Sequence, residues 1–225
     1  MKKRKIAIAI DGPAGAGKST MAKAVAKELG YLYVDTGAIY RTVGYHMFLM
    51  GIGPRDADGI AKYLDDVNIG IEYRDGVQHM FLNGADVTEE IRSPEASRYA
   101  SGVSAQPVVR AFLLEMQRDF ARKNNVVMDG RDIGTVVLPN AQVKIFLTAS
   151  PEVRAQRRYL ELTEKGEKTT FEQVLADMKQ RDKQDSERAI APLRCAPDAV
   201  KLDTSDLSIE QAVQAILQLV GGAQA

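Results

Sequence analysis

The segment IDGPAGAGKST at residues 10–20 carries the most distinctive chemistry of the sequence. Gly12 begins a G-x-x-x-x-G-K-[ST] pattern that ends in Lys18 and Ser19, the spacing of a phosphate-binding loop between a strand and a helix. In such a loop, main-chain N–H groups surround a triphosphate, the lysine reaches its β- and γ-phosphates, and the serine hydroxyl binds Mg²⁺. The pattern therefore predicts binding of MgATP. The residues expected at the ATP are Gly12, Pro13, Ala14, Gly15, Ala16, Gly17, Lys18, Ser19 and Thr20.

A second oxygen group for Mg²⁺ is expected at the carboxyl end of a neighbouring parallel strand. The segment VVMDG at residues 126–130 places Asp129 there. We expect Ser19 to bind the metal directly and Asp129 to hold it through a water molecule. Asp35, which ends the segment YLYVD, is the alternative, and Asp129 in its Asp-Gly pair is also typical of a simple turn.

Arginines, rather than a general base, are expected to carry the chemistry. The only histidines, His46 and His79, stand in a helical apolar run and in a hairpin region, where neither is placed as a base. An acceptor that is itself a phosphate would need no base, because a monoester with a second pKa of about 6 is already largely ionised at neutral pH. Arginines would then neutralise the charge of both substrates. The candidates, each in a short polar motif, are Arg41, Arg131, Arg181 and Arg188.

Five β-rich segments alternate with helical patterns and would position these residues. An order of this kind predicts an α/β fold with a parallel sheet wrapped by helices. Gly30 is expected to end the helix that follows the loop, and capping boxes are expected before two later helices, at Thr170 with Gln173 and at Ser208 with Gln211. The five segments are 6–11, 31–35, 126–130, 143–148 and 199–205.

Residues 68–92 break this alternation. Asp75-Gly76 and Asn83-Gly84 are strong hairpin signals between strand-like runs, so a small antiparallel meander is expected. Because the βαβ order resumes afterwards, we interpret 63–102 as a subdomain inserted into one domain of residues 1–225, whose core is 1–62 and 103–225.

Composition narrows the class of partners. Thirty Lys and Arg balance thirty Asp and Glu, which leaves no overall field for nucleic acid or an anionic membrane. The lone Cys195 requires no oxidising compartment, and no apolar run approaches the ~20 residues of a membrane span. The apolar run after the basic start is too short for a signal peptide. We expect a cytoplasmic monomer whose partners are small molecules.

Six segments in order make the chain resemble the bacterial cytidylate kinases, a family of P-loop nucleoside monophosphate kinases. The resemblance covers nearly the whole length. It implies a five-stranded parallel sheet, an insert that binds the monophosphate and contains the meander, and a short lid at 154–168 whose Arg157 contacts ATP. The segments are IDGPAGAGKST, VDTGAIYR, NGADVTEEIRS, residues 101–110, DGRDIGTVV and RDKQDSERAIAPL.

The same resemblance implies transfer of the γ-phosphoryl group of MgATP to CMP or dCMP. Its catalytic residues would be Lys18, Arg131, Arg181 and Arg188. Ser101, Arg110 and Asp132 would read the base, because a carboxylate accepts from the cytosine N4 amine while uracil would turn an O4 acceptor toward it. The residues expected at the ribose and phosphate are Thr36, Tyr40, Arg41, Arg131, Asp185 and Arg188.

Two other classes stay open on the residues alone. A kinase for another small metabolite would share the loop but not the acceptor site. A nucleotide-sensing module would bind ATP without transferring a phosphoryl group. GTPases and protein kinases are disfavoured, since the chain has no N-K-x-D, H-R-D or D-F-G string.

Overall fold

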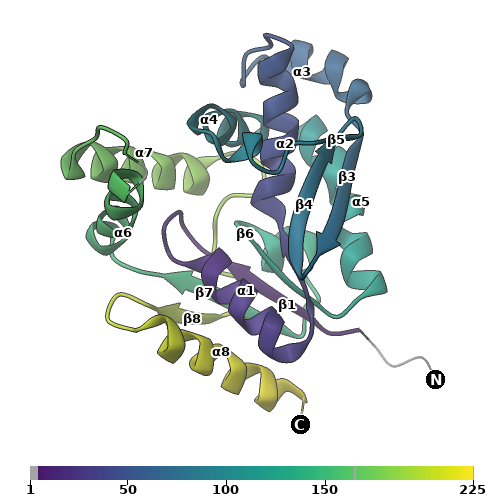
Figure 1. Cartoon of the computed structure of the whole chain (residues 1–225). Helices are drawn as coiled ribbons and strands as arrows, with labels where there is room; N and C mark the ends of the chain where they lie inside the picture. Colours follow the sequence, from purple (N-terminus) through teal and green to yellow (C-terminus); the bar gives the residue numbers. More distant parts are fainter. Residues whose placement is uncertain (1–4, 165, 225) are drawn as a thin grey trace. The chain divides into compact units, whose positions relative to one another are not determined.

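The computed structural model describes residues 5–164 and 166–224 and confirms the predicted α/β fold. The central sheet has five strands in the order β2-β6-β1-β7-β8. The pairs β1–β6, β1–β7 and β7–β8, whose strands are labelled in Figure 1, are parallel. A second, three-stranded sheet has the order β3-β4-β5 and is antiparallel. All five strand segments expected from the sequence are present.

By compactness the chain divides into two units, Met1–Tyr31 with Asn125–Ala225, and Leu32–Asn124. The first unit contains β1 (Ala7–Asp11), α1 (Lys18–Leu29), β6 (Val126–Gly130), a π-helical turn η3 (Ile133–Val137), β7 (Val143–Thr148), α6 (Pro151–Glu164), α7 (Phe171–Glu187), β8 (Val200–Asp203) and α8 (Ile209–Gln224). The second unit contains β2 (Leu32–Asp35), α2 (Thr36–Leu49), α3 (Ala57–Tyr63), η1 (Leu64–Asp66), β3 (Ile69–Arg74), β4 (Val77–Leu82), β5 (Ala85–Asp86), η2 (Glu90–Arg92), α4 (Pro94–Val103) and α5 (Pro107–Lys123).

The first unit is built around two strands, β1 and β6, that are buried along their whole length. Every residue of β1 and β6 is buried, as expected for parallel strands covered on both faces. Helices α1 and α8 pack against each other beside this sheet (Figure 1). As predicted, α1 ends at Gly30, whose left-handed φ of 64° lets its N–H reach the last carbonyls of the helix.

The second unit joins the small sheet to a pair of closely packed helices. The two hairpin turns confirm the prediction, with Asp75 and Asn83 in the left-handed conformation at φ 52° and 51°. Helix α2 packs mainly on α4, and the crossing requires Gly44, because a Cβ there would lie 2.8 Å from the main-chain N of Ala100.

The capping boxes predicted for α7 and α8 are both present. The Thr170 hydroxyl accepts from the Gln173 N–H, and the Gln173 side chain accepts from the Thr170 N–H. Ser208 and Gln211 make the same reciprocal pair. These side chains satisfy N–H groups that a helix start leaves unpaired, which is why the pattern is readable from sequence.

The predicted insert at 63–102 stays a prediction, and so does closure of a lid at 154–168. The division by compactness falls elsewhere, at residues 31 and 124, because α2 packs with α4 and α3 packs with α5. The predicted lid spans most of α6 and the connection to α7, of which residue 165 lies outside the described residues.

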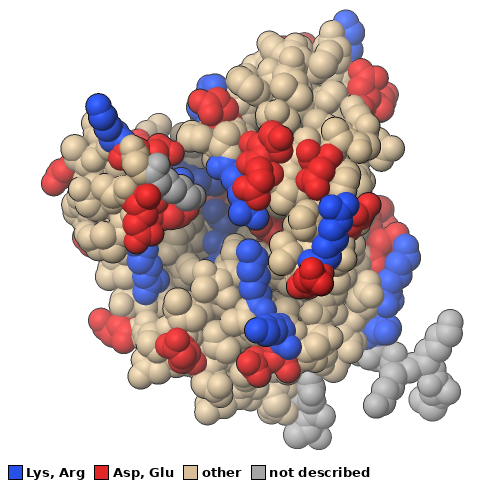
Figure 2. Space-filling model, in the orientation of Figure 1, with Lys and Arg blue, Asp and Glu red and all other residues tan. Residues whose placement is uncertain are grey.

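The distribution of charged and apolar residues in the structure agrees with what the composition predicts. Figure 2 shows basic and acidic side chains interspersed over the face that it draws, in keeping with their equal numbers in the sequence. Within residues 5–164 and 166–224, no helix combines the length and the apolar character needed to cross a bilayer.

Candidate active site

The phosphate-binding loop leaves β1 and enters α1 in a conformation that only glycine adopts easily. Gly12 has φ 149°, and a Cβ on it would lie 1.9 Å from the Leu147 carbonyl oxygen of β7. Gly17, with φ 83°, is the N-cap of α1, so no side chain caps the first N–H groups of that helix. Main chain therefore comes close to the strand ends, and a helix N-terminus faces the loop, the usual arrangement for binding phosphate.

Lys18 is a buried cation at the centre of the first unit's polar residues. Its Nζ donates to the Pro13 carbonyl at 2.7 Å. Burial, followed by the nearby positive charge of Arg131, lowers the pKa of Lys18 from 10.5 to about 7. Burial and the charge of Arg131 both disfavour the protonated form of Lys18. A bound anion would stabilise that form, because its negative charge offsets the repulsion between Lys18 and Arg131.

Ser19 and Asp129 lie together at the carboxyl edge of the sheet. The Ser19 hydroxyl donates to Asp129 Oδ2 at 2.9 Å, and the register of β1 and β6 sets Asp129 opposite Ile10. A hydroxyl beside a carboxylate is the kind of oxygen pair that suits Mg²⁺. In the second unit, the alternative Asp35 uses one oxygen to cap α2 at the Ala38 N–H and the other to pair with Arg41. This geometry favours Asp129 over Asp35 as the metal-holding carboxylate.

Arg131 and Asp185 form the main ion pair of the predicted acceptor residues in the first unit. Arg131 Nε donates to Asp185 Oδ2 at 2.9 Å. Burial alone would raise the pKa of Asp185, but the charge and hydrogen bond of Arg131, with Arg181 and Arg188, hold that pKa below its ordinary value. Because the charge of Arg181 also lowers the pKa of Lys18, Arg181 lies within electrostatic reach of both groups. Asp185 thus stays ionised and orients Arg131.

Arg188 and Asp132 form a second, looser pair. Arg188 Nη2 lies 3.5 Å from Asp132 Oδ1, both side chains are buried, and Arg188 Nε donates to the Ala191 carbonyl at 2.5 Å. A predicted phosphate contact and a predicted base contact are therefore neighbours within one unit.

Asp11, at the end of β1, is a buried carboxylate next to the predicted site that sequence reasoning missed. Its two oxygens accept from the Ile133 N–H at 2.8 Å and the Gly134 N–H at 2.7 Å, which holds the turn directly after Asp132. Burial raises the pKa of Asp11 to about 6, although these two hydrogen bonds act in the opposite direction. A carboxylate ending an otherwise apolar buried strand was the available signal.

Arg157, predicted to contact ATP, lies beside the loop in the first unit. Its guanidinium donates to the Thr204 carbonyl at 2.7 Å and to the Thr204 hydroxyl at 3.4 Å. That hydroxyl is 3.5 Å from the Ala16 carbonyl of the phosphate-binding loop. Contact of Arg157 with ATP stays a prediction.

The second unit contains the other predicted acceptor residues. Thr36 is buried at the first position of α2, and Arg41 lies one turn later, paired with the Asp35 cap. The buried Arg110 of α5 donates to the Ser104 carbonyl, and its guanidinium carbon lies 5.7 Å from the centre of the Tyr40 ring. The Arg110 guanidinium and the Tyr40 ring thus form a cation–π contact, which stabilises the position of both side chains.

Ser101 and Gln78 are two further polar residues of that unit. Ser101, predicted to read the base, lies in α4. Gln78 of β4, which sequence reasoning missed, accepts from the Asp35 N–H at 2.9 Å and donates to the Asp35 carbonyl at 3.3 Å. It thereby fixes the start of α2, and only the fold places it there.

Comparison with known proteins decides the family. The family model described as cytidylate kinase matches residues 8–221. The chain is 52% identical to the cytidylate kinase of Caldicellulosiruptor bescii over 96% of each chain, and 49% identical to that of Bacillus cereus over 97% of each chain. The chain belongs to the cytidylate kinase family. Because the match runs from β1 into α8, membership in the cytidylate kinase family extends over both units.

A solved structure of an uncharacterised protein from Eubacterium ventriosum shares the fold. It has a TM-score of 0.51 and 15% identity, and the alignment covers 96% of this chain and 99% of that chain. At this identity the likeness shows the fold alone.

Proposed function

We propose that the protein transfers the γ-phosphoryl group of MgATP to CMP or dCMP and releases ADP with CDP or dCDP. The observation that carries the proposal is the match to cytidylate kinases across both units, at 52% identity to one of them. The buried basic residues beside a phosphate-binding loop supply the chemistry that this reaction needs.

The donor is held by the residues from Gly12 to Thr20. The loop N–H groups and the N-terminus of α1 bind the phosphates, and Lys18 turns its ammonium from the Pro13 carbonyl to the β- and γ-oxygens. Ser19 and Asp129 fit Mg²⁺ and would hold it, Ser19 directly and Asp129 through water. When bound, the metal neutralises charge on the phosphates and orients them for in-line transfer.

Transfer needs positioning and charge stabilisation rather than a base. The CMP phosphate is already ionised at neutral pH, so its oxygen attacks without losing a proton to the protein. Arg131, Arg181 and Arg188 balance the charge that two phosphate groups bring together. The ionised Asp185 keeps Arg131 oriented for this role.

Selection of cytosine is assigned to Asp132 in the first unit and to Ser101 and Arg110 in the second. Asp132 would accept from the N4 amine, while the other two would donate to N3 and O2. Uracil presents O4 in place of the amine, and the resulting clash of two acceptors would disfavour UMP by roughly a hundredfold. Tyr40 packed on Arg110 keeps that cation in place.

The test is an ADP-release assay with MgATP and each of CMP, dCMP, UMP, AMP, GMP and dTMP. We expect rapid turnover with CMP and dCMP and much slower turnover with UMP. Turnover of a different small molecule would favour the metabolite kinase, and ATP binding without any transfer would favour the sensor. A cytoplasmic location, a monomeric state and the absence of nucleic acid partners belong to the same proposal.

A further inference from the structure

Arg154 is the most deeply buried arginine among the described residues, and its guanidinium bonds to three separate segments of the first unit. Its Nε donates to the Ala149 carbonyl at 2.9 Å, just before α6. Its Nη1 donates to the Ala14 carbonyl in the phosphate-binding loop at 3.1 Å. Its Nη2 pairs with Asp182 Oδ2 on α7 at 2.7 Å. One side chain therefore joins the donor loop to both helices of the α6–α7 pair.

The bond to Ala14 has a consequence for the neighbouring N–H group. In a trans peptide group, the carbonyl and the N–H that follows it point in opposite directions. Because Arg154 holds the Ala14 carbonyl, the N–H of Gly15 is directed away from the guanidinium. In a phosphate-binding loop, main-chain N–H groups aimed in this way are the phosphate ligands.

Packing reinforces this orientation. Ala14 packs on a small apolar cluster of α6 and α7 that contains Ala155 and Met178. A Cβ on Gly15 would lie 2.6 Å from Met178 Cε and 3.2 Å from Arg154 Cβ. The loop thus lies directly against the two helices, with no room for a side chain between them.

We infer that Arg154 is a positioning residue for phosphoryl transfer, which orients the Gly15 N–H for the donor phosphates and, through Asp182, fixes α7 against the loop. Helix α7 carries Arg181 and Asp185, so the second link sets the acceptor-side charges relative to the donor. The second link, from Arg154 through Asp182 to α7, rests on the proposed function. The first link concerns ATP binding alone.

The first link is tested by ATP affinity. In Arg154→Met, which keeps the length of the side chain but none of its donors, we expect the dissociation constant for MgATP, measured by calorimetry, to rise about tenfold. Arg154→Lys keeps the charge but cannot bond to all three acceptors, so an intermediate rise is expected. The KM for CMP should stay within about twofold in both variants, because neither touches that site directly.

The second link is tested by separating Asp182 from Arg154. In Asp182→Asn, we expect kcat to fall about fivefold while the dissociation constant for MgATP changes less than about twofold. The double variant Arg154→Met with Asp182→Asn should lose no more kcat than Arg154→Met alone, because Arg154→Met already breaks the link that Asp182→Asn removes. As a matched control, Lys179→Met removes an exposed ion pair to Glu152 that joins the same two helices, and should leave both quantities unchanged.

A role in packing alone would give a different pattern. Unchanged ATP affinity and kcat in Arg154→Met, with only a lower melting temperature, would overturn the inference. Losses in Asp182→Asn and Arg154→Met that simply multiply in the double variant would overturn the second link. If Arg154→Met does not fold, Arg154→Lys and Asp182→Asn carry both tests. Wild-type protein that binds ATP but does not phosphorylate CMP would contradict the proposed function and leave the affinity test in force.

Discussion

The two units hold their predicted site residues by different physical means. The first unit uses ion pairs that are largely shielded from water, as between Arg131 and the buried Asp185, whereas the second relies on a helix cap and a neutral amide, as at Asp35 and Gln78. Among the described residues, the charged residues that are buried as a whole are, in the first unit, Asp11, Lys18, Asp129, Asp132, Lys144, Arg154 and Asp185, and, in the second, Arg110. The side chain of Arg188 in the first unit is buried as well.

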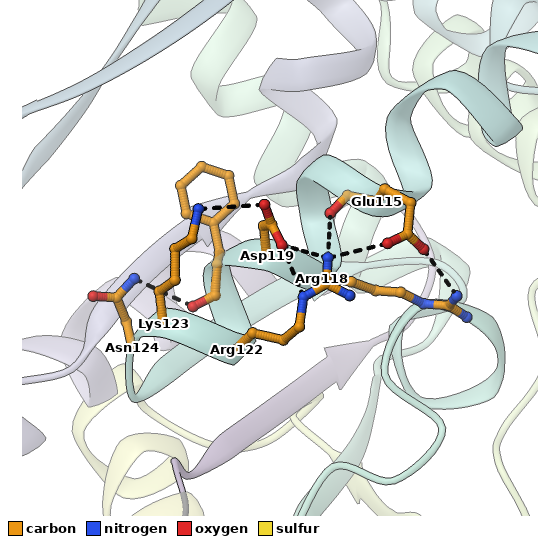
Figure 3. A network of polar contacts seen from close by, with 7 residues as sticks. Glu115, Arg118, Asp119, Arg122, Lys123 and Asn124 are labelled. Atoms are coloured by element: carbon orange, nitrogen blue, oxygen red, sulfur yellow. Dashed lines mark hydrogen bonds and ion pairs between the residues drawn. The ribbon is translucent and has the colours of Figure 1, made fainter.

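Charges of the second unit are found mainly at its surface. The network at the end of α5 is an example: Figure 3 shows Arg122 bonded to both Glu115 and Asp119, and Lys123 reaching Asp119. Arg122 Nη2 lies 3.0 Å from Glu115 Oε2, and both side chains are more than half exposed. The comparison shows that an ion pair contributes more to stability and positioning when it is buried than when it is exposed, because water screens exposed charges far more than buried ones.

The largest expected effect comes from breaking the central pair of the first unit. Asp185→Ala should raise the KM for CMP by on the order of a hundredfold, because Arg131 loses its partner in a site from which water is largely excluded. ATP affinity should change little. Steady-state kinetics with each substrate varied in turn check this, with Asp185→Asn as the variant that keeps the volume. CMP kinetics equal to wild type would contradict the role of Asp185.

A smaller effect is expected from pH, through Asp11. Its folded-state pKa of about 6 lies above the ordinary aspartate value of 3.8, so the folded chain takes up a proton near pH 6 that the unfolded chain does not. The contribution of Asp11 to the free energy of unfolding therefore increases as the pH falls, by about 1 kcal/mol between pH 7 and pH 5. Urea unfolding of wild type and Asp11→Asn at both pH values measures this difference. Parallel pH profiles would show that Asp11 is not a strained buried carboxylate.

The second unit should respond to loss of a specific hydrogen bond. Asp35→Ala removes the α2 cap and the partner of Arg41, so we expect a loss of about 1 kcal/mol in unfolding free energy and a rise of about fivefold in the KM for CMP. Asp35→Asn keeps a capping oxygen and should restore the stability but not the KM. Equal stability of the Ala and Asn variants would mean that the cap does not anchor α2.

The smallest effect is expected in the surface network of α5. Glu115→Gln removes the carboxylate that Arg118 and Arg122 share, yet the melting temperature should change by about 2 °C or less and turnover should not change. Thermal unfolding of wild type and Glu115→Gln at low and high salt measures the change in melting temperature. A shift as large as that of a buried pair would remove the contrast between the units.

Interactions between residues near in sequence were readable without the fold. The phosphate-binding loop, the strands, the hairpin turns at Asp75 and Asn83, and the caps at Thr170 and Ser208 each depend on the spacing of a few adjacent residues. Their geometry follows from local main-chain preferences, so the residues themselves specify it.

Only the folded chain showed which distant groups meet. Asp11 binds main chain 122 and 123 residues away, and Arg154 binds the loop 140 residues away. The choice between Asp35 and Asp129 likewise depended on partners that no spacing reveals. Local patterns predicted the loop and the elements around it because the conformation of these segments depends on residues adjacent in the sequence. Burial, and with it the pKa of each charged group, depends on how separate segments pack, and therefore appears only in the tertiary structure.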